Sequence, residues 1–198
     1  MTETSAELAE LIGSRICHDL ISPIGAINNG LELLELTGAQ QGPELDLIAD
    51  SVVNASARIR FFRITYGAAG DQSVGAAEIS GILDDLGRGS RLRYDWRIQG
   101  AQPRALVRLA FLALQCCEST MPQGGEITVS QSDGQWTVTG SAGRFNPDPE
   151  LWELVMGQRH DGDVAPAQVQ FALLPLLAAE AGRHVLVEKD DCQISLQF

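Results

Sequence analysis

Two long amphipathic helical patterns joined by a short turn restrict the possible folds of this chain more than any other feature. In the first pattern, residues 8–34, the apolar side chains fall on one side of a helical wheel drawn at about 100° per residue. The second pattern, residues 45–66, repeats apolar residues at alternating spacings of three and four, which is a heptad seam. Residues 38–42 read as a turn, Pro43 suits the first position of a helix, and Gly67 suits its end. The two segments are predicted to form an antiparallel helical hairpin.

A hairpin of this kind cannot bury both of its apolar faces by itself. The stripe of the first helix comprises Ile12, Ile16, Leu20, Pro23, Ile24, Ile27, Leu31 and Leu34. The seam of the second comprises Leu45, Ile48, Val52, Ala55, Ile59, Phe62 and Tyr66. The hairpin must therefore pack on another domain or on a second copy of itself. Because two hairpins make a four-helix bundle, a homodimer is expected.

After a small, polar, glycine-rich linker at residues 67–75, helical and strand-like segments alternate. The predicted helices cover residues 76–87, 103–120, 147–157 and 166–181. The predicted strands cover residues 91–99, 126–131, 135–140, 184–189 and 192–198. The spacing of the second and third of these strands is typical of a β-hairpin. The fold class is therefore α+β, with a helical hairpin domain at residues 1–70 followed by an α/β sandwich domain at residues 76–198.

Composition excludes several classes of function. The formal net charge is −12, from 14 basic and 26 acidic residues, so nucleic acids and anionic membrane surfaces are poor partners. The only lysine is Lys189, which rules out the Gly-Lys-Ser/Thr signature of a P-loop. The acidic start lacks the features of a secretion signal, and the longest apolar run, residues 171–179, is too short to span a bilayer. A cytoplasmic protein is expected. The four cysteines form no metal-ligand pattern.

One histidine lies on the polar side of the first helix. On the helical wheel His18 is opposite the apolar stripe, with Ser14, Ser22, Gly25 and Asn29 beside it. These neighbours are small or uncharged, so a partner molecule could approach the imidazole closely. The other two histidines, His160 and His184, belong to no spaced ligand set and are assigned to structure.

The chemistry of this segment suits a nucleophile. A neutral imidazole attacks through one ring nitrogen while the other carries a proton. The carboxylate of Asp19 is the candidate to hold that proton and fix the tautomer. Pro23, one turn further on, lacks the N–H that would bond the carbonyl of Asp19 and is expected to bend the helix.

The segment from His18 to Leu36 resembles the phosphoacceptor box of histidine kinases, in which a histidine is followed by an acidic residue, a Ser or Thr and a proline. The longer string from Ser14 to Glu35, SRICHDLISPIGAINNGLELLE, is similar specifically to the ChpT-type histidine phosphotransferases. In that family the hairpin is followed by a domain that resembles the ATP-binding domain of histidine kinases but lacks the nucleotide site.

The second domain shows the same loss. Its segment PQGGEITV, residues 122–129, resembles the one that follows the kinase Asn box, and the metal-binding Asn would then fall near Cys116. The region that should hold Asp-x-Gly-x-Gly reads TGSAGRF, residues 139–145, and the region of the glycine-rich phosphate lid, before residue 166, holds no such run of glycines. Each missing part had a separate task in holding Mg²⁺, adenine or phosphate, so ATP binding is not expected.

The resemblance implies a histidine phosphotransferase of a two-component phosphorelay. Such a protein takes a phosphoryl group from the receiver Asp of a hybrid histidine kinase onto His18 and passes it to the receiver Asp of response regulators. It needs no cofactor of its own, since Mg²⁺ is expected on the receiver. Two alternatives stay open: an ATP-dependent autokinase with a divergent nucleotide site, and a non-catalytic adaptor. The residues expected to bind the partner are Arg15, Ile21, Ser22, Gly25 and Asn29, with His18 and Asp19 as the catalytic pair.

Overall fold

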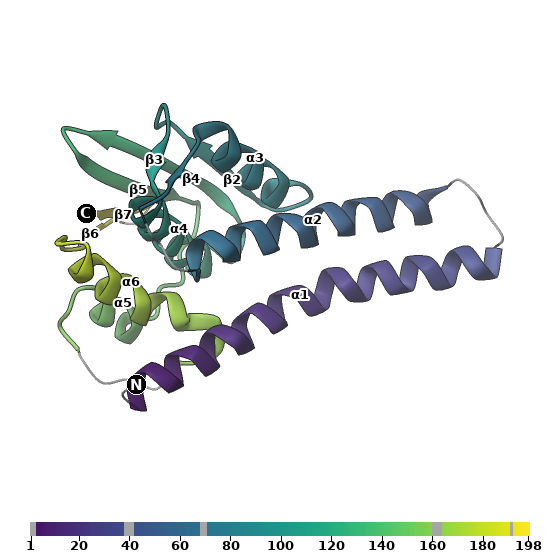
Figure 1. Cartoon of the computed structure of the whole chain (residues 1–198), viewed down its shortest axis with the longest axis horizontal. Coiled ribbons are helices and arrows are strands. Elements are labelled where there is room, and N and C mark those ends of the chain that lie inside the picture. Colours follow the sequence, from purple (N-terminus) through teal and green to yellow (C-terminus); the bar gives the residue numbers. More distant parts are fainter. Residues whose placement is uncertain (1–2, 38–41, 68–70, 160–163, 191) are drawn as a thin grey trace.

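A computed structural model describes residues 3–37, 42–67, 71–159, 164–190 and 192–198. Two long helices begin the chain: α1 spans Glu3–Thr37 and α2 spans Pro43–Thr65. They run antiparallel, and one end of the pair projects away from the rest of the molecule as an arm (Figure 1). The predicted hairpin is confirmed, with Pro43 in the first turn of α2, whereas most of the predicted turn lies outside the described residues.

The elements that follow form a two-layer structure, here called the C-terminal unit (residues 73–198). Its helices are α3 (Ala76–Gly87), α4 (Arg104–Ser119), α5 (Pro149–Val155), the short 3₁₀ helix η1 (Pro166–Gln168) and α6 (Val169–Glu180). Its strands are β1 (Ser73–Val74), β2 (Leu92–Trp96), β3 (Gln102–Pro103), β4 (Gly125–Ser132), β5 (Gln135–Ser141), β6 (Leu186–Lys189) and β7 (Gln193–Gln197). The α+β class with a helical hairpin and an α/β sandwich is confirmed.

The main sheet has five strands in the order β2-β4-β5-β7-β6, and only the β2–β4 pair is parallel. The β4–β5 hairpin is closed by Asp133 and Gly134, both with positive φ, which matches the two-residue turn that tight hairpins prefer. Buried residues alternate along β5 and β7, so one face of the sheet, covered by α4, forms the core.

The helical hairpin and the C-terminal unit share one continuous core. Phe61, near the end of α2, stacks on Phe111 of α4 with ring centroids 4.4 Å apart. Leu8, Ile12 and Leu20 of α1 pack against the same core cluster. The half of the hairpin nearest the chain start is therefore fixed to the C-terminal unit, and the other half is the projecting arm (Figure 1).

The structure differs from the sequence predictions most clearly in its first strands. The predicted linker contains β1, which pairs with β3 through Ser73–Pro103 and Val74–Gln102. The strand predicted at residues 91–99 is only five residues long and pairs in parallel. Helix α1 includes Pro23, which is buried. Among the described residues, no helix is both long and apolar enough to cross a membrane.

Candidate functional site

His18 lies about midway along α1 and is exposed. Its side chain is 78% exposed. The ring nitrogen Nδ1 lies 3.1 Å from Oδ1 of Asp19. Because a carboxylate only accepts hydrogen bonds, this contact places the ring proton on Nδ1. The other nitrogen, Nε2, then carries the lone pair of an open imidazole.

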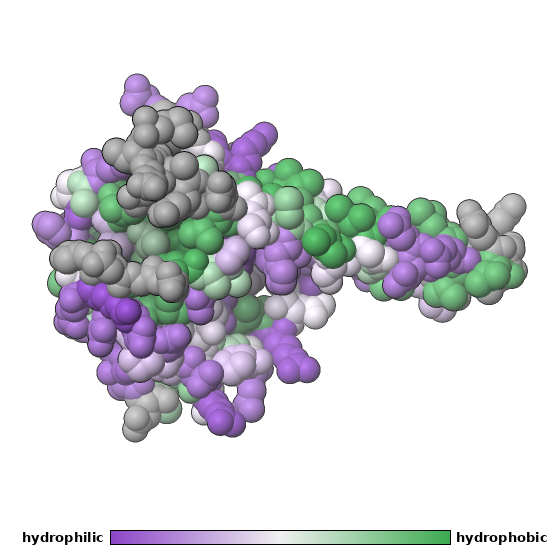
Figure 2. Space-filling model, turned by 90° about the horizontal axis from the view of Figure 1, so that it is seen from below, coloured by the Kyte–Doolittle hydropathy of each residue, from purple (hydrophilic) through white to green (hydrophobic). Residues whose placement is uncertain are grey.

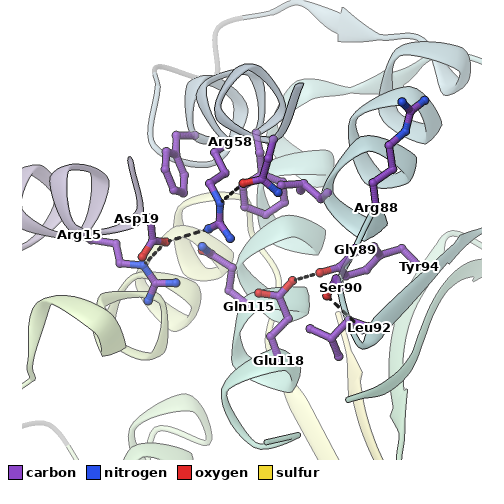
Figure 3. A pocket seen from close by; sticks show the side chains of 14 residues that line it. Arg15, Asp19, Arg58, Arg88, Gly89, Ser90, Leu92, Tyr94, Gln115 and Glu118 are labelled. Atoms are coloured by element: carbon purple, nitrogen blue, oxygen red, sulfur yellow. Dashed lines mark hydrogen bonds and ion pairs between the residues drawn. The ribbon is translucent and has the colours of Figure 1, made fainter. Parts of the chain in front are cut away.

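The neighbouring Asp19 is held on its other side by two arginines. Its side chain is only 11% exposed, and its Oδ2 accepts a hydrogen bond of 2.8 Å from Nε of Arg15, one helical turn earlier. Nη1 of Arg58 on α2 lies 3.6 Å from the same oxygen, and Nε of Arg58 donates to Oδ1 of Asn54 at 3.0 Å. Figure 3 shows Arg15 and Arg58 approaching Asp19 from different helices. The carboxylate therefore lies between a histidine and two cations.

The residues predicted to bind a partner differ in their placement. Ile21 is 69% exposed, Ser22 and Asn29 are exposed, and Gly25 has no atom within 4 Å of where a side chain would begin. These four surround or follow His18 on the open side of α1. Arg15 is different, because its side chain is 14% exposed and its guanidinium contacts Asp19, the carbonyl of Ala167 and Gln170. Arg15 thus lies within the molecule's own contacts rather than on the open side.

A cavity of about 290 Å³ lies behind Asp19, between the hairpin, the turn from α3 to β2, and α4. Its walls include the arginines that contact Asp19 and, on the opposite side, the acidic residue Glu118 of α4 (Figure 3). Gln115 of the same helix is buried and accepts a hydrogen bond of 3.0 Å from the hydroxyl of Tyr66. Burial raises the pKa of Tyr66 to about 12. The cavity wall therefore contains several polar groups that have partners within the protein.

Burial dominates the ionisation of Glu118. Removal from water raises the pKa of its carboxyl group, although a 2.6 Å hydrogen bond from the hydroxyl of Tyr94 and the charges of Arg15 and Arg58 act in the opposite direction. Burial and the same carboxylate also raise the pKa of Tyr94. Burial therefore opposes ionisation of Glu118.

Replacing Glu118 with glutamine is expected to stabilise the protein at pH 8 by a few degrees in Tm. The pKa of this carboxyl group is higher in the folded than in the unfolded protein. Its ionisation therefore does not lower the free energy of unfolding at low pH, but lowers it as the pH rises through the folded-state pKa. Glutamine is neutral throughout and can still accept from Tyr94. The gain in Tm should therefore shrink as the pH approaches 4 in a series of thermal melts. A gain that is independent of pH would show that ionisation of Glu118 is not its cause.

Two further arginines of α2 lie close to acidic side chains of α3. Arg60 pairs with Asp85 at 2.5 Å and Arg63 lies 3.8 Å from Glu78. Cys116 and Cys117 are fully buried on α4, and burial raises the pKa of both thiols. Within the described parts of the chain, no three His, Cys, Asp or Glu side chains gather as a metal site would require.

Two contributors to the site were not predicted from sequence. They are Arg58 of α2, close to Asp19, and Gln170 of α6, close to Arg15. The contact between Arg15 and Asp19 could have been predicted, because oppositely charged residues spaced at i and i+4 on a helix pair with each other. The contacts of Arg15 with Ala167 and Gln170 join residues about 150 positions apart, and no local pattern indicates them.

Comparison with known proteins identifies the family. Residues 76–193 match the family model for the histidine phosphotransferase C-terminal domain. The protein phosphotransferase ChpT of Brucella abortus (strain 2308) is 35% identical over 196 residues, which cover 94% of this chain and 92% of that protein. A solved structure of a bacterial phosphotransferase is 33% identical and superposes with a TM-score of 0.82, covering 100% of this chain and 98% of the other. The chain belongs to the ChpT-type histidine phosphotransferases, enzymes of phosphorelays.

Proposed function

We propose that His18 is the phosphoacceptor, taking a phosphoryl group from the receiver Asp of a hybrid histidine kinase and passing it to the receiver Asp of response regulators. The observation that carries this proposal is the open imidazole of His18, whose Nδ1 lies 3.1 Å from the carboxylate of Asp19. A nucleophile needs a free lone pair and room for its substrate, and Nε2 has both.

The proposed step moves the phosphoryl group from the receiver to the imidazole of His18. Nε2 of His18 attacks the phosphorus of an aspartyl phosphate, an N–P bond forms, and the P–O bond to the receiver breaks. The receiver carboxylate leaves with the bonding electron pair. The imidazole gains positive charge while Nδ1 keeps its proton, and the carboxylate of Asp19 stabilises that charge. Transfer to the next receiver is the same step in reverse, and Mg²⁺ on the receiver would neutralise charge on the phosphoryl oxygens.

The receiver is proposed to dock on the open side of α1 around His18. Ile21 offers an exposed apolar contact, while Ser22, Gly25 and Asn29 are small or uncharged and follow His18 at helical spacing. Gly25 leaves space for close approach. Arg15 was predicted to belong to this surface, but its contacts with Asp19 and Gln170 suggest another task.

The protein is further proposed to act as a homodimer whose hairpins form a four-helix bundle. Large apolar side chains are half exposed along the hairpin: Ile24, Leu31, Leu45, Val52 and Ile59. The last three are spaced by seven residues, as in a coiled-coil seam. Figure 2 shows hydrophobic surface along the projecting arm. A second copy presenting the same face would bury these side chains.

The C-terminal unit is proposed to work without ATP. The position near which a kinase would carry its metal-binding asparagine holds Cys116, whose thiol is fully buried and whose pKa is raised by that burial. The two domains are proposed to be residues 1–70 and 76–198, and the chain itself is proposed to need no cofactor. The protein is expected to act in the cytoplasm, with neither nucleic acid nor membrane as a partner.

Three incubations test this function. With labelled ATP alone the protein is expected to stay unlabelled, and with a phosphorylated donor receiver it is expected to gain an acid-labile phosphate. When an unphosphorylated second receiver is added, label should reach it only if the protein is present. Labelling by ATP alone would identify an autokinase, and receiver binding without any acid-labile phosphate would identify an adaptor.

A further inference from the structure

The carboxylate of Asp19 has two oxygens with different partners. Oδ1 faces Nδ1 of His18, while Oδ2 accepts from Arg15 at 2.8 Å and lies 3.6 Å from Arg58. A carboxylate bonded only to the histidine could rotate about its side-chain torsions and lose that contact. Two cations on Oδ2 restrict this rotation and keep Oδ1 directed at the imidazole.

The two arginines are themselves held. Arg58 lies on α2 and donates to Asn54, one turn earlier on the same helix. Arg15 reaches from α1 to the C-terminal unit, where Nη1 contacts the carbonyl oxygen of Ala167 and lies 3.4 Å from Oε1 of Gln170. The guanidinium of Arg15 therefore connects Asp19 to a part of the chain far away in sequence.

The side-chain acceptor for Arg15, Gln170, lies in a buried part of the C-terminal unit. Gln170 is 1% exposed in the first turn of α6. Its side-chain nitrogen donates to the carbonyl of Ala167 at 3.1 Å, so the amide orientation is fixed and Oε1 is directed at the guanidinium. Helix α1 packs against both η1 and α6 at this place.

We propose that Arg15 and Arg58 are positioning residues for phosphotransfer. In this proposal Ala167 and Gln170 of the C-terminal unit hold Arg15, and Arg15 keeps the carboxylate of Asp19 directed at His18. This inference rests on the proposed role of His18 as phosphoacceptor. It gives the C-terminal unit a direct task in the reaction that needs no nucleotide. Correct placement of an orienting group acts on the rate of the chemical step rather than on the encounter with the receiver.

The test measures single-turnover transfer from a phosphorylated receiver to the full-length protein at increasing receiver concentration. Arg58→Gln is expected to lower the saturating rate about tenfold, and Gln170→Leu about threefold, with the half-saturating receiver concentration unchanged. Arg58→Lys should recover a large part of the loss, because it restores the charge beside Oδ2. Arg63→Gln is the matched control, since Arg63 lies on the same helix, is exposed, and pairs only weakly with Glu78; its rate should equal that of the wild type.

A second measurement begins with the wild-type protein, so its first result does not depend on the folding of any variant. The ¹⁵N chemical shifts of the His18 ring in the wild type should report the tautomer protonated at Nδ1, and Arg58→Gln and Gln170→Leu should shift the ring toward the tautomer protonated at Nε2. A wild-type ring protonated at Nε2 would overturn the proposal. So would folded variants of Arg58 and Gln170 that transfer at the wild-type rate, and that result would leave His18 as the acceptor. A wild-type protein that gains no phosphate at His18 would instead refute the proposed function.

Discussion

Replacing His18 with glutamine is expected to abolish acquisition of phosphate from a phosphorylated receiver, by about three orders of magnitude or more. Glutamine has no nucleophilic nitrogen, since its amide lone pair is delocalised. The exchange should leave the fold unchanged, because the imidazole is 78% exposed and its hydrogen bond with a side chain is the contact to Asp19. The rate of transfer and the thermal midpoint of the same preparation measure the two effects separately.

The matched control is His184→Gln. His184 is also exposed but lies in the C-terminal unit, just before β6. This variant should transfer phosphate at the wild-type rate, which shows that losing an exposed histidine is not in itself harmful. Undiminished transfer by the His18 variant would place the phosphoacceptor elsewhere in the chain.

Replacing Val52 and Ile59 with glutamate together is expected to convert a dimer into a monomer. These side chains are 47% and 55% exposed on α2 and lie seven residues apart on the face proposed to meet the second copy. In a two-fold dimer the double variant removes four apolar side chains from the interface, each of which contributes about 1.5–3 kcal/mol when fully buried. It also introduces four carboxylates there. The dimer dissociation constant should rise by at least about a thousandfold, as sedimentation or light scattering over a concentration series would measure.

Leu186→Glu is the control for the dimer variant. Leu186 on β6 is also a large apolar residue, 59% exposed, but it lies on the C-terminal unit and away from the arm. Its replacement by glutamate should leave the oligomeric state unchanged. A wild-type protein that sediments as a monomer at all concentrations would contradict the four-helix bundle, and the apolar face of the arm would then need another partner.

The parts of the fold that were predictable are those that local patterns specify. The helix predicted at residues 76–87 has the same bounds in the structure, and the β4–β5 turn follows from the preference of Asp133 and Gly134 for positive φ. The β1–β3 pairing was missed because two-residue strands carry no periodicity. Its partners meet only once the chain is folded.

The helical wheel of α1 shows a second limit. It grouped Ile24 and Leu31 with Ile12 and Leu20 in a single apolar stripe. In the structure Ile12 and Leu20 pack on the core shared with the C-terminal unit, whereas Ile24 and Leu31 are about half exposed. Periodicity identifies which side of a helix is apolar, but it does not say whether the same chain or another one covers that side.

The site was predictable where its members are neighbours in sequence. His18 and Asp19 are adjacent, and their contact follows from that adjacency and the chemistry of a His–Asp pair. The inward position of Arg15 was not predictable, because its wheel position is close to that of His18. Only the packing of α1 against η1 and α6 turns its guanidinium toward Ala167 and away from the open side.

Mixing the purified protein with a phosphorylated receiver domain, without nucleotide, and mapping the phosphate at neutral pH tests most directly whether His18 carries the reaction. As the receiver loses its phosphate, an acid-labile phosphoryl group should accumulate on the peptide that contains His18, attached through Nε2 because Nδ1 faces the carboxylate of Asp19. Phosphate found on another residue, or a receiver that binds but keeps its phosphate, would contradict the central role of this histidine.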